Sequence, residues 1–185
     1  MCISYESDAL FMSFDKQKAE ASKKNLQNAD LKNADLQEAD LSEGILIEAC
    51  LENCNLSEAD LCGTDISGAN LKNARLHRTV LYRCRGKEVD FSNAVLTQAN
   101  LVEANLSGAN FTHANLMESN IEGANLTNAC FKDANLSEVN LTGVFLTNAN
   151  LSGANFTNSE CIAADLVGCD LTGANLQNTY LNHAD

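Results

Sequence analysis

The chain has 185 residues, enough for one domain or a short repeat array, and it contains neither Pro nor Trp. Its formal net charge of −13 argues against binding to nucleic-acid phosphates or to an anionic membrane surface, and leaves basic protein partners open. No stretch approaches the ~20 apolar residues of a membrane span and the N-terminus lacks the basic region of a signal peptide, so we expect a cytoplasmic protein.

Residues 1–23 precede the repeats and are predicted to form an N-terminal cap, helical or irregular. Ser7 or Asp8 is placed to cap a helix in which Leu10, Phe11 and Phe14 share one face. A solenoid exposes its end coils to solvent, so we expect this segment to cover the first coil.

From residue 24 to residue 185 the sequence repeats every five residues. In steps of five from Leu26 to Leu181, 30 of the 32 central positions hold Leu, Ile or Phe, and the exceptions are Gly86 and Cys161. The residue three after each centre, and so two before the next one, is always small or short and β-branched from Ala29 to Ala184, and it is Ala at 20 of these 32 positions. The residue just before the centre is mostly Asn or Asp, and eight of the ten glycines follow a centre by two.

A period of five fits neither a helix nor a strand, so the chain must turn once in every repeat. The central residue then points inward, Asn or Asp bonds to the backbone of its own turn, and Gly relieves that turn sterically. Four repeats close a square of 20 residues, and the coils stack at a strand spacing of about 4.8 Å. The pattern predicts an all-β, quadrilateral β-helix of about eight coils with a Leu/Phe core.

Two segments, ADLKNADLQEADLSE at 29–43 and ANLVEANLSGANFTHANLMES at 99–119, resemble the A(D/N)LXX motif of the pentapeptide-repeat family. The resemblance covers nearly the whole chain from residue 24. It implies a right-handed β-helix, a mostly non-catalytic role, and a protein of a kind abundant in some cyanobacteria. It also implies an alternative role, because the best-understood members bind DNA gyrase as duplex mimics and confer quinolone resistance.

The residues that usually carry chemistry do not converge. Residues 20 apart are neighbours in adjacent coils, and no two of the eight cysteines stand in that relation, so we expect reduced thiols packed as small hydrophobes. No His has a Cys or His partner at metal-ligand spacing. No nucleophile with a base, phosphate-binding loop or carboxylate pair is recognisable, so we expect no enzyme, no metal and no cofactor.

Three phenylalanines, Phe91, Phe111 and Phe131, are predicted to form one inner ladder in successive coils. Gly86 leaves a core side chain missing beside them. Two interpretations stay open: local repacking, with a phenyl ring leaning into the gap, or a bulge over Arg83–Glu88 that binds a partner.

Residues 72–87 form a basic belt with six Lys or Arg and no acid. One interpretation is a ladder of ion pairs between coils, each stabilising by a few tenths of a kcal/mol. The other is recruitment of a partner. The pairs expected from the columns are Arg78 over Glu58, Arg85 over Asp65, Arg83 beneath Glu103, and an alternation of Lys32, Glu52 and Lys72.

The four faces of a coil are numbered from the one that holds Leu26. A more specific partner surface is predicted on the fourth face, which holds the centres Leu81 and Leu101. Val80, Tyr82 and Val102 point outward there, and Arg83 and Arg85 border them. Tyr and Arg on an apolar ground are typical of interaction hot spots.

A homodimer interface is predicted at the C-terminal coil, formed by Leu171, Leu176, Tyr180 and Leu181. Together with Leu166 the leucines make a square with one face bare, and no Pro, Lys cluster or helix blunts the strand edges. Two-fold stacking of two such coils would cover both faces. The alternative is that the last residues fold over the end or fray.

These features favour a non-catalytic structural or protein-interaction module, a rigid acidic rod that presents a flank to a protein partner. The second hypothesis, from the resemblance, is a DNA-mimicking inhibitor or protector of DNA gyrase. A duplex mimic needs continuous rows of carboxylates. Here Asn replaces Asp from Asn100 through Asn155 wherever the motif holds, and the basic belt interrupts the acidic part, so the first hypothesis is preferred.

Overall fold

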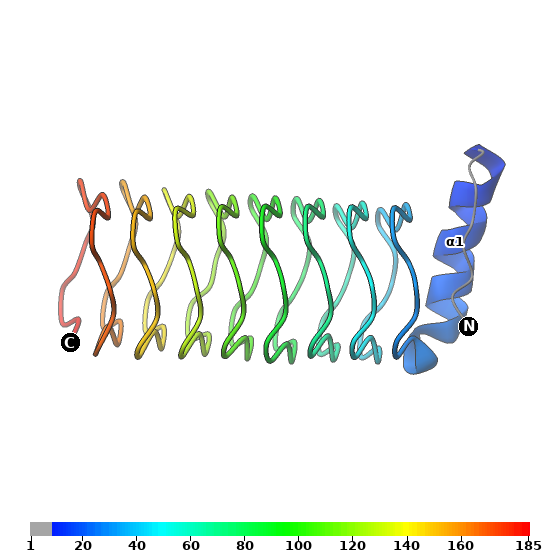
Figure 1. Ribbon diagram of the computed structural model, residues 1–185, viewed down its shortest axis with the longest axis horizontal. Helices are drawn as coiled ribbons and strands as arrows, with labels where there is room; N and C mark the ends of the chain where they lie inside the picture. The colour runs from blue at the N-terminus through cyan, green and yellow to red at the C-terminus, as the bar shows by residue number, and fades with distance from the viewer. Residues whose placement is uncertain (1–8) are drawn as a thin grey trace.

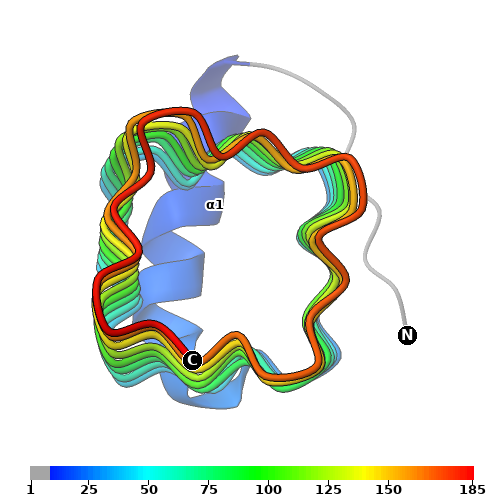
Figure 2. The same cartoon turned by 90° about the vertical axis from the view of Figure 1, so that its left-hand side faces the viewer.

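The computed structural model describes the backbone of residues 9–185 and the side chains of residues 16–185. Helix α1 (Ala9–Ser22) is followed by a short 3-10 helix, η1 (Lys23–Asn25), and then by the coils of a right-handed quadrilateral β-helix. The coils lie side by side along a straight axis, with α1 across one end (Figure 1). Seen along that axis, the coils superpose as a square (Figure 2).

Part of the predicted cap cannot be compared with the structure. Ser7 and Asp8 lie outside the described residues, as do the side chains of Leu10, Phe11 and Phe14. The helical form of the cap is confirmed by α1. No helix within residues 9–185 combines the length and apolar character that crossing a bilayer requires.

The β-structure consists of single-residue parallel bridges. The residue before each centre pairs with the residue 20 positions later, from the Asp30–Cys50 bridge to the Glu160–Tyr180 bridge. Flanking backbone hydrogen bonds join the same coils; for example, the Leu36 N–H donates to the carbonyl oxygen of Asn55 at 2.7 Å. The constant 20-residue register confirms that four repeats close one coil.

Every repeat turns at the second residue after its centre. All 32 of these positions, eight glycines and 24 other residues, have a left-handed φ between 50° and 73°. In all but two of these turns the N–H of the small residue bonds to the carbonyl of the centre, as from Ala34 to Leu31 at 3.0 Å; the exceptions are the turns that end at Val89 and Val139. This is the arrangement of a type II turn. The eight in-phase glycines therefore stand where predicted, and at the other positions L-residues accept a conformation that costs about 1–2 kcal/mol each.

The core is the square column of central side chains. From Leu36 to Cys161 these side chains are essentially inaccessible to solvent. The rings of Phe91, Phe111 and Phe131 stack nearly parallel, with centroids 4.9 and 4.6 Å apart, which confirms the predicted ladder. Among the four buried hydroxyls at the small positions of residues 16–185, those of Thr64, Thr79 and Ser159 donate to the carbonyl of the residue 23 positions earlier, whereas Ser119 Oγ has no hydrogen-bond partner.

Aliphatic neighbours fill the gap at Gly86. A Cβ placed there would lie 2.6 Å from Leu106 Cδ2, 3.0 Å from Ile66 Cγ1 and 3.0 Å from Val89 Cγ2. Repacking is therefore the correct interpretation, but the side chains that close the gap are aliphatic. Phe91 remains stacked in its own ladder.

The alternative of a bulge over Arg83–Glu88 is wrong. Arg85 bridges Asp65 on one side and Asn105 on the other, in the same register as every other repeat. Glu88 takes the usual left-handed turn, with a φ of 59°. The missing side chain is absorbed by packing because the backbone ladder holds the coil in place.

The cap is attached to the first coil by both packing and polar contacts. Ala19 of α1 is buried in the core, and Glu20 Oε1 accepts the N–H of Asp40 at 2.9 Å. The carbonyl of Lys23 accepts the N–H of Ile45 at 2.7 Å, so η1 supplies strand-like bonds to the first coil. Lys23 Nζ also lies 2.8 Å from Asp40 Oδ1.

This ion pair fixes the charge of Asp40. The hydrogen bond from Lys23, then those from the hydroxyl and N–H of Ser42, lower the pKa of Asp40 to about 2. The carboxylate therefore stays ionised in the folded protein at any ordinary pH.

Candidate functional site

The residues predicted to form a partner surface lie close together in adjacent coils. Val80, Tyr82 and Val102 are half-buried and lie on neighbouring coils, while Arg83 and Arg85 are exposed. Val80 bridges residues 60 and 100 above and below it. The N–H of Arg83 donates to the carbonyl of Val102 at 3.0 Å. Backbone hydrogen bonds between adjacent coils therefore hold the segments that bear Val80, Tyr82 and Val102.

Arg83 is held in place from two sides. Its guanidinium carbon lies 4.8 Å from the centroid of the Tyr82 ring, within the range of a cation–π contact. Its Nε donates to Glu103 Oε2 at 2.6 Å, and this bond raises the pKa of the guanidinium. The side chains of Tyr82 and Arg83 therefore form one preorganised unit at the surface.

The ion-pair ladder is formed only in part. Arg83–Glu103, Arg85–Asp65 at 3.3 Å and Lys32–Glu52 at 2.8 Å are formed as expected. All of these groups are at least partly solvent-exposed, so solvent screens the pairs and they contribute little to stability.

The expected pairing of Arg78 with Glu58 is wrong. Arg78 Nε donates instead to Gln98 Oε1 at 2.8 Å, in the coil on the other side. Gln98 Nε2 in turn donates to Glu118 Oε2 at 2.7 Å, so a chain of hydrogen bonds joins Arg78 to Glu118 across three coils. Within residues 16–185, Lys72 and Arg75 form no ion pair, and the Lys32–Glu52–Lys72 alternation is completed only at its first step.

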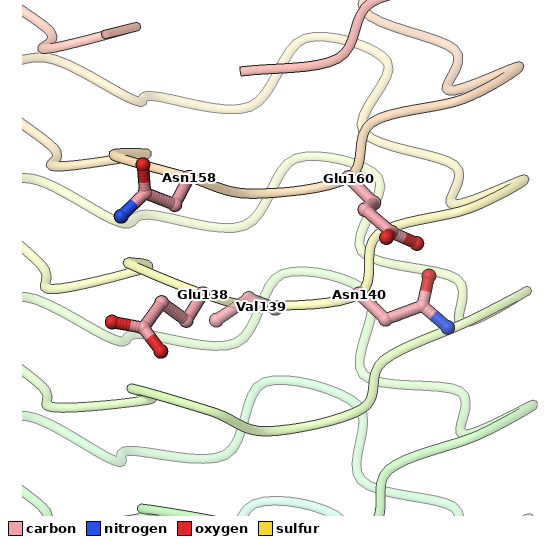
Figure 3. Close-up of a pocket in the computed structure, with 5 residues that line it drawn as sticks. All are labelled: Glu138, Val139, Asn140, Asn158 and Glu160. Atoms are coloured by element: carbon pink, nitrogen blue, oxygen red, sulfur yellow. The ribbon is translucent and has the colours of Figure 1, made fainter. Parts of the chain in front are cut away.

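One open hollow lies on the corner between the third and fourth faces, with a volume of about 460 Å³. Glu138, Val139, Asn140, Asn158 and Glu160 line it. The carboxylates of the two glutamates lie on opposite sides of Val139 and point apart (Figure 3). They do not meet as an acid–base pair. No group of three or more His, Cys, Asp or Glu among the described residues is arranged to hold a metal ion.

Three of the cysteines among residues 16–185, Cys54, Cys84 and Cys161, are buried by the fold, and the other four are half-buried. None of the seven cysteines among residues 16–185 forms a disulfide. Burial raises the pKa of Cys84 and of Cys161 to about 12, so these two thiols stay protonated and unreactive.

The predicted dimer residues form the accessible end of the core. Leu171 is half-buried, while Leu176, Tyr180 and Leu181 are 38%, 60% and 39% exposed. Equivalent leucines inside the rod are fully buried, so the final coil exposes apolar surface that the inner coils cover.

Sequence reasoning missed an exposed apolar pair on the first face. Phe145 is 52% exposed and Val167 is 56% exposed, in adjacent coils. A signal was available for Phe145, because it occupies a position where neighbouring repeats carry Asn or Asp.

Comparison with known proteins agrees with the fold. The family model described as pentapeptide repeats matches eight copies, at residues 22–57, 46–78, 54–85, 90–133, 119–158 and 134–173. No sequence among the curated proteins matches the chain significantly.

Three solved structures illustrate the likeness. HetL, a pentapeptide repeat protein involved in heterocyst differentiation regulation from Nostoc sp. strain PCC 7120, is 30% identical over 85% of this chain and 83% of its own, with a TM-score of 0.46. A pentapeptide repeat protein of the Arabidopsis thaliana thylakoid lumen is 33% identical over 59% of this chain and 69% of its own, with a TM-score of 0.43. A variant of QnrB1, a plasmid-mediated fluoroquinolone resistance protein, is 23% identical over 85% of this chain and 82% of its own, with a TM-score of 0.44.

Proposed function

The chain belongs to the pentapeptide-repeat family, and from that premise we propose that it is a non-catalytic protein-interaction module, a rigid acidic rod that presents one flank to a protein partner. The observation that carries this proposal is the preorganised pair of Tyr82 and Arg83 on half-buried valines. The hydrogen bond to Glu103 and the contact with the Tyr82 ring fix the side chain of Arg83 in the free protein, which reduces the conformational entropy lost on binding.

The rod itself favours this use. Backbone hydrogen bonds join neighbouring coils on every face, and the central side chains pack continuously between them. A surface built on such a scaffold keeps its shape, so its side chains bind as a fixed pattern. The flank proposed for the partner consists of Val80, Tyr82, Arg83, Arg85 and Val102.

The test begins with capture of a partner from the source cell and measurement of its affinity. Tyr82→Ala combined with Arg83→Ala should weaken binding by at least about 1–2 kcal/mol, the usual cost of losing hot-spot residues. Arg75→Ala is the matched control, since it removes a cation of the same belt from a different face. Unchanged affinity of the double variant, with an intact circular-dichroism spectrum, would contradict the proposal.

Duplex mimicry is the less supported alternative. Between Asn100 and Asn155 the position before each centre holds Asn, except at Cys130 and Phe145, and several of these amides bond to one another: Asn155 donates to Asn135 at 3.3 Å and Asn135 donates to Asn115 at 3.0 Å. Such a column is neutral, whereas a phosphate mimic needs charge. We expect no inhibition in a gyrase supercoiling assay with purified protein. Potent inhibition would make duplex mimicry the preferred function over the protein-interaction module.

We also propose that two copies stack through the coil that holds Leu171, Leu176, Tyr180 and Leu181. The exposed leucines support this, because a second identical coil offers a self-complementary surface. Sedimentation should show a dimer that becomes monomeric when Leu181→Glu and Tyr180→Glu are combined. A wild-type monomer at high micromolar concentration would exclude the stacking.

A further inference from the structure

The first face carries an apolar feature that the repeat does not require. Phe145 is 52% exposed and stands in a column whose neighbouring members are Asn125 and Asp165. Val167, two residues after Asp165, is 56% exposed. Single exposed apolar residues are ordinary on protein surfaces, but two large ones on adjacent coils around one charge need an explanation.

The charge between them is fixed in position. Asp165 bridges Phe145 in the ladder, and its Oδ1 accepts the N–H of Val167 at 3.0 Å. Its Oδ2 accepts the hydroxyl of Thr147 at 2.7 Å. These hydrogen bonds, the one from Thr147 first, hold the pKa of Asp165 below its ordinary value. The carboxylate is therefore ionised and held in one orientation, beside Phe145 of the adjacent coil and Val167 two residues further along the chain.

No cation within residues 16–185 pairs with this carboxylate. Residues 133–185 contain six Asp or Glu and neither Lys nor Arg. The C-terminal third of the rod therefore has a negative field that attracts basic segments and repels nucleic acid and anionic membranes.

We propose that Phe145, Asp165 and Val167 form a docking surface for a basic segment of another protein, in which an arginine pairs with Asp165 and lies against the ring of Phe145. Arginine fits both elements at once, since its planar guanidinium binds a carboxylate through paired hydrogen bonds and stacks on an aromatic face. An aliphatic neighbour of that arginine would cover Val167. This surface is separate from the Tyr82 flank and does not depend on it.

The test uses a fluorescein-labelled peptide that alternates arginine with valine, and fluorescence anisotropy at low ionic strength. Asp165→Asn removes the charge, and Phe145→Asn introduces the residue type of the neighbouring repeat, which the turn accepts. Asp170→Asn is the matched control: it removes the same charge from a turn in which Oδ1 also accepts an N–H two residues on, from Thr172 at 2.9 Å, but on another face.

Asp165→Asn and Phe145→Asn should each weaken binding of the peptide by roughly tenfold or more, as expected for hot-spot groups. Asp170→Asn and Tyr82→Ala should change it by less than about twofold, as expected for remote surface charges and contacts. A peptide with lysine in place of arginine should bind several-fold more weakly, since an ammonium cannot form the paired bonds.

Three results would overturn the proposal. Absence of binding to the wild-type protein would do so, as would equal losses for Asp165→Asn and Asp170→Asn, which indicate attraction by net charge alone. A third is conversion of a dimer of the protein alone to a monomer by Phe145→Asn, because the occupant would then be a second copy. Circular dichroism of each variant shows that the fold is retained.

Discussion

Replacing Gly86 with leucine, the usual central residue, tests the packing of the core most directly. Burial of a leucine stabilises a protein by about 1.5–3 kcal/mol, and loss of a glycine removes about 0.4–1 kcal/mol of unfolded-state entropy. The repeat pattern alone therefore predicts that Gly86→Leu stabilises the protein. The structure predicts the opposite, because a Cβ at this position would already lie 2.6 Å from Leu106 Cδ2 and 3.0 Å from Val89 Cγ2.

The magnitude follows from how little the site can expand. The backbone on both sides of Gly86 is bonded to the adjacent coils; its own N–H donates to the carbonyl of Asn105 at 2.8 Å. Overpacking of a core of this kind costs about 1–3 kcal/mol, and the hydrophobic gain is lost because the new side chain has no space. We expect the free energy of unfolding to fall by that amount.

The compensating change is Val89→Ala. Alanine occupies 20 of the 32 equivalent positions, and it would remove the Cγ2 that closes the gap. The double variant, Gly86→Leu with Val89→Ala, should regain near wild-type stability, with a coupling energy of at least about 1 kcal/mol in the double-mutant cycle.

Urea unfolding followed by far-ultraviolet circular dichroism measures all four members of the cycle. Gly86→Ala is a milder control, because the terminal methyl of Leu106 must turn away but Ile66 and Val89, each 3.0 Å from the new Cβ, need shift only slightly. Two results would refute the reasoning: a Gly86→Leu variant that is as stable as the wild type, or strictly additive effects of the two substitutions.

The turn glycines, the cap and the buried thiols each give a further prediction. Gly153→Ala should lower the urea midpoint more than Gly143→Ala: both glycines have a left-handed φ, but a Cβ at 153 would meet the carboxylate stacked beneath it and a Cβ at 143 would meet nothing. Because the pKa of Asp40 falls to about 2 in the folded state, its ion pair with Lys23 stabilises the cap above the unfolded pKa of about 4. That contribution should be lost as the pH falls from 4 to 2. When the helicity of α1 is followed over this pH range, a Lys23→Met variant should lose less stability than the wild type. Since burial raises the pKa of Cys84 to about 12, this thiol should resist iodoacetamide at pH 8 until urea unfolds the protein. Peptide mapping separates it from the half-buried thiols such as Cys50 and Cys62, and labelling of Cys84 in the native protein would contradict the closed core.

The direction of each side chain could be predicted from the sequence alone. Every repeat has the same backbone geometry, so the phase of a residue decides whether its Cβ points into the core or into solvent. This is why the inner ladder of Phe91, Phe111 and Phe131 was predictable, and why Tyr82 could be placed outward beside Val80. The cap could be predicted only as a type of segment, because α1 lies outside the repeat and its contacts depend on two non-repeating sequences.

Only the tertiary structure decided which neighbour each side chain contacts. Arg78 can reach the coil below or the coil above, and its bond to Gln98 in place of Glu58 is a choice of rotamer that phase does not fix. The gap at Gly86 is filled by the side chains of Leu106, Ile66 and Val89, while the backbone ladder keeps its register. Phe145 is exposed because the outward wall has no second layer to cover it. The five-residue pattern fixes where each Cβ points, whereas the reach and packing of the atoms beyond it depend on three-dimensional neighbours.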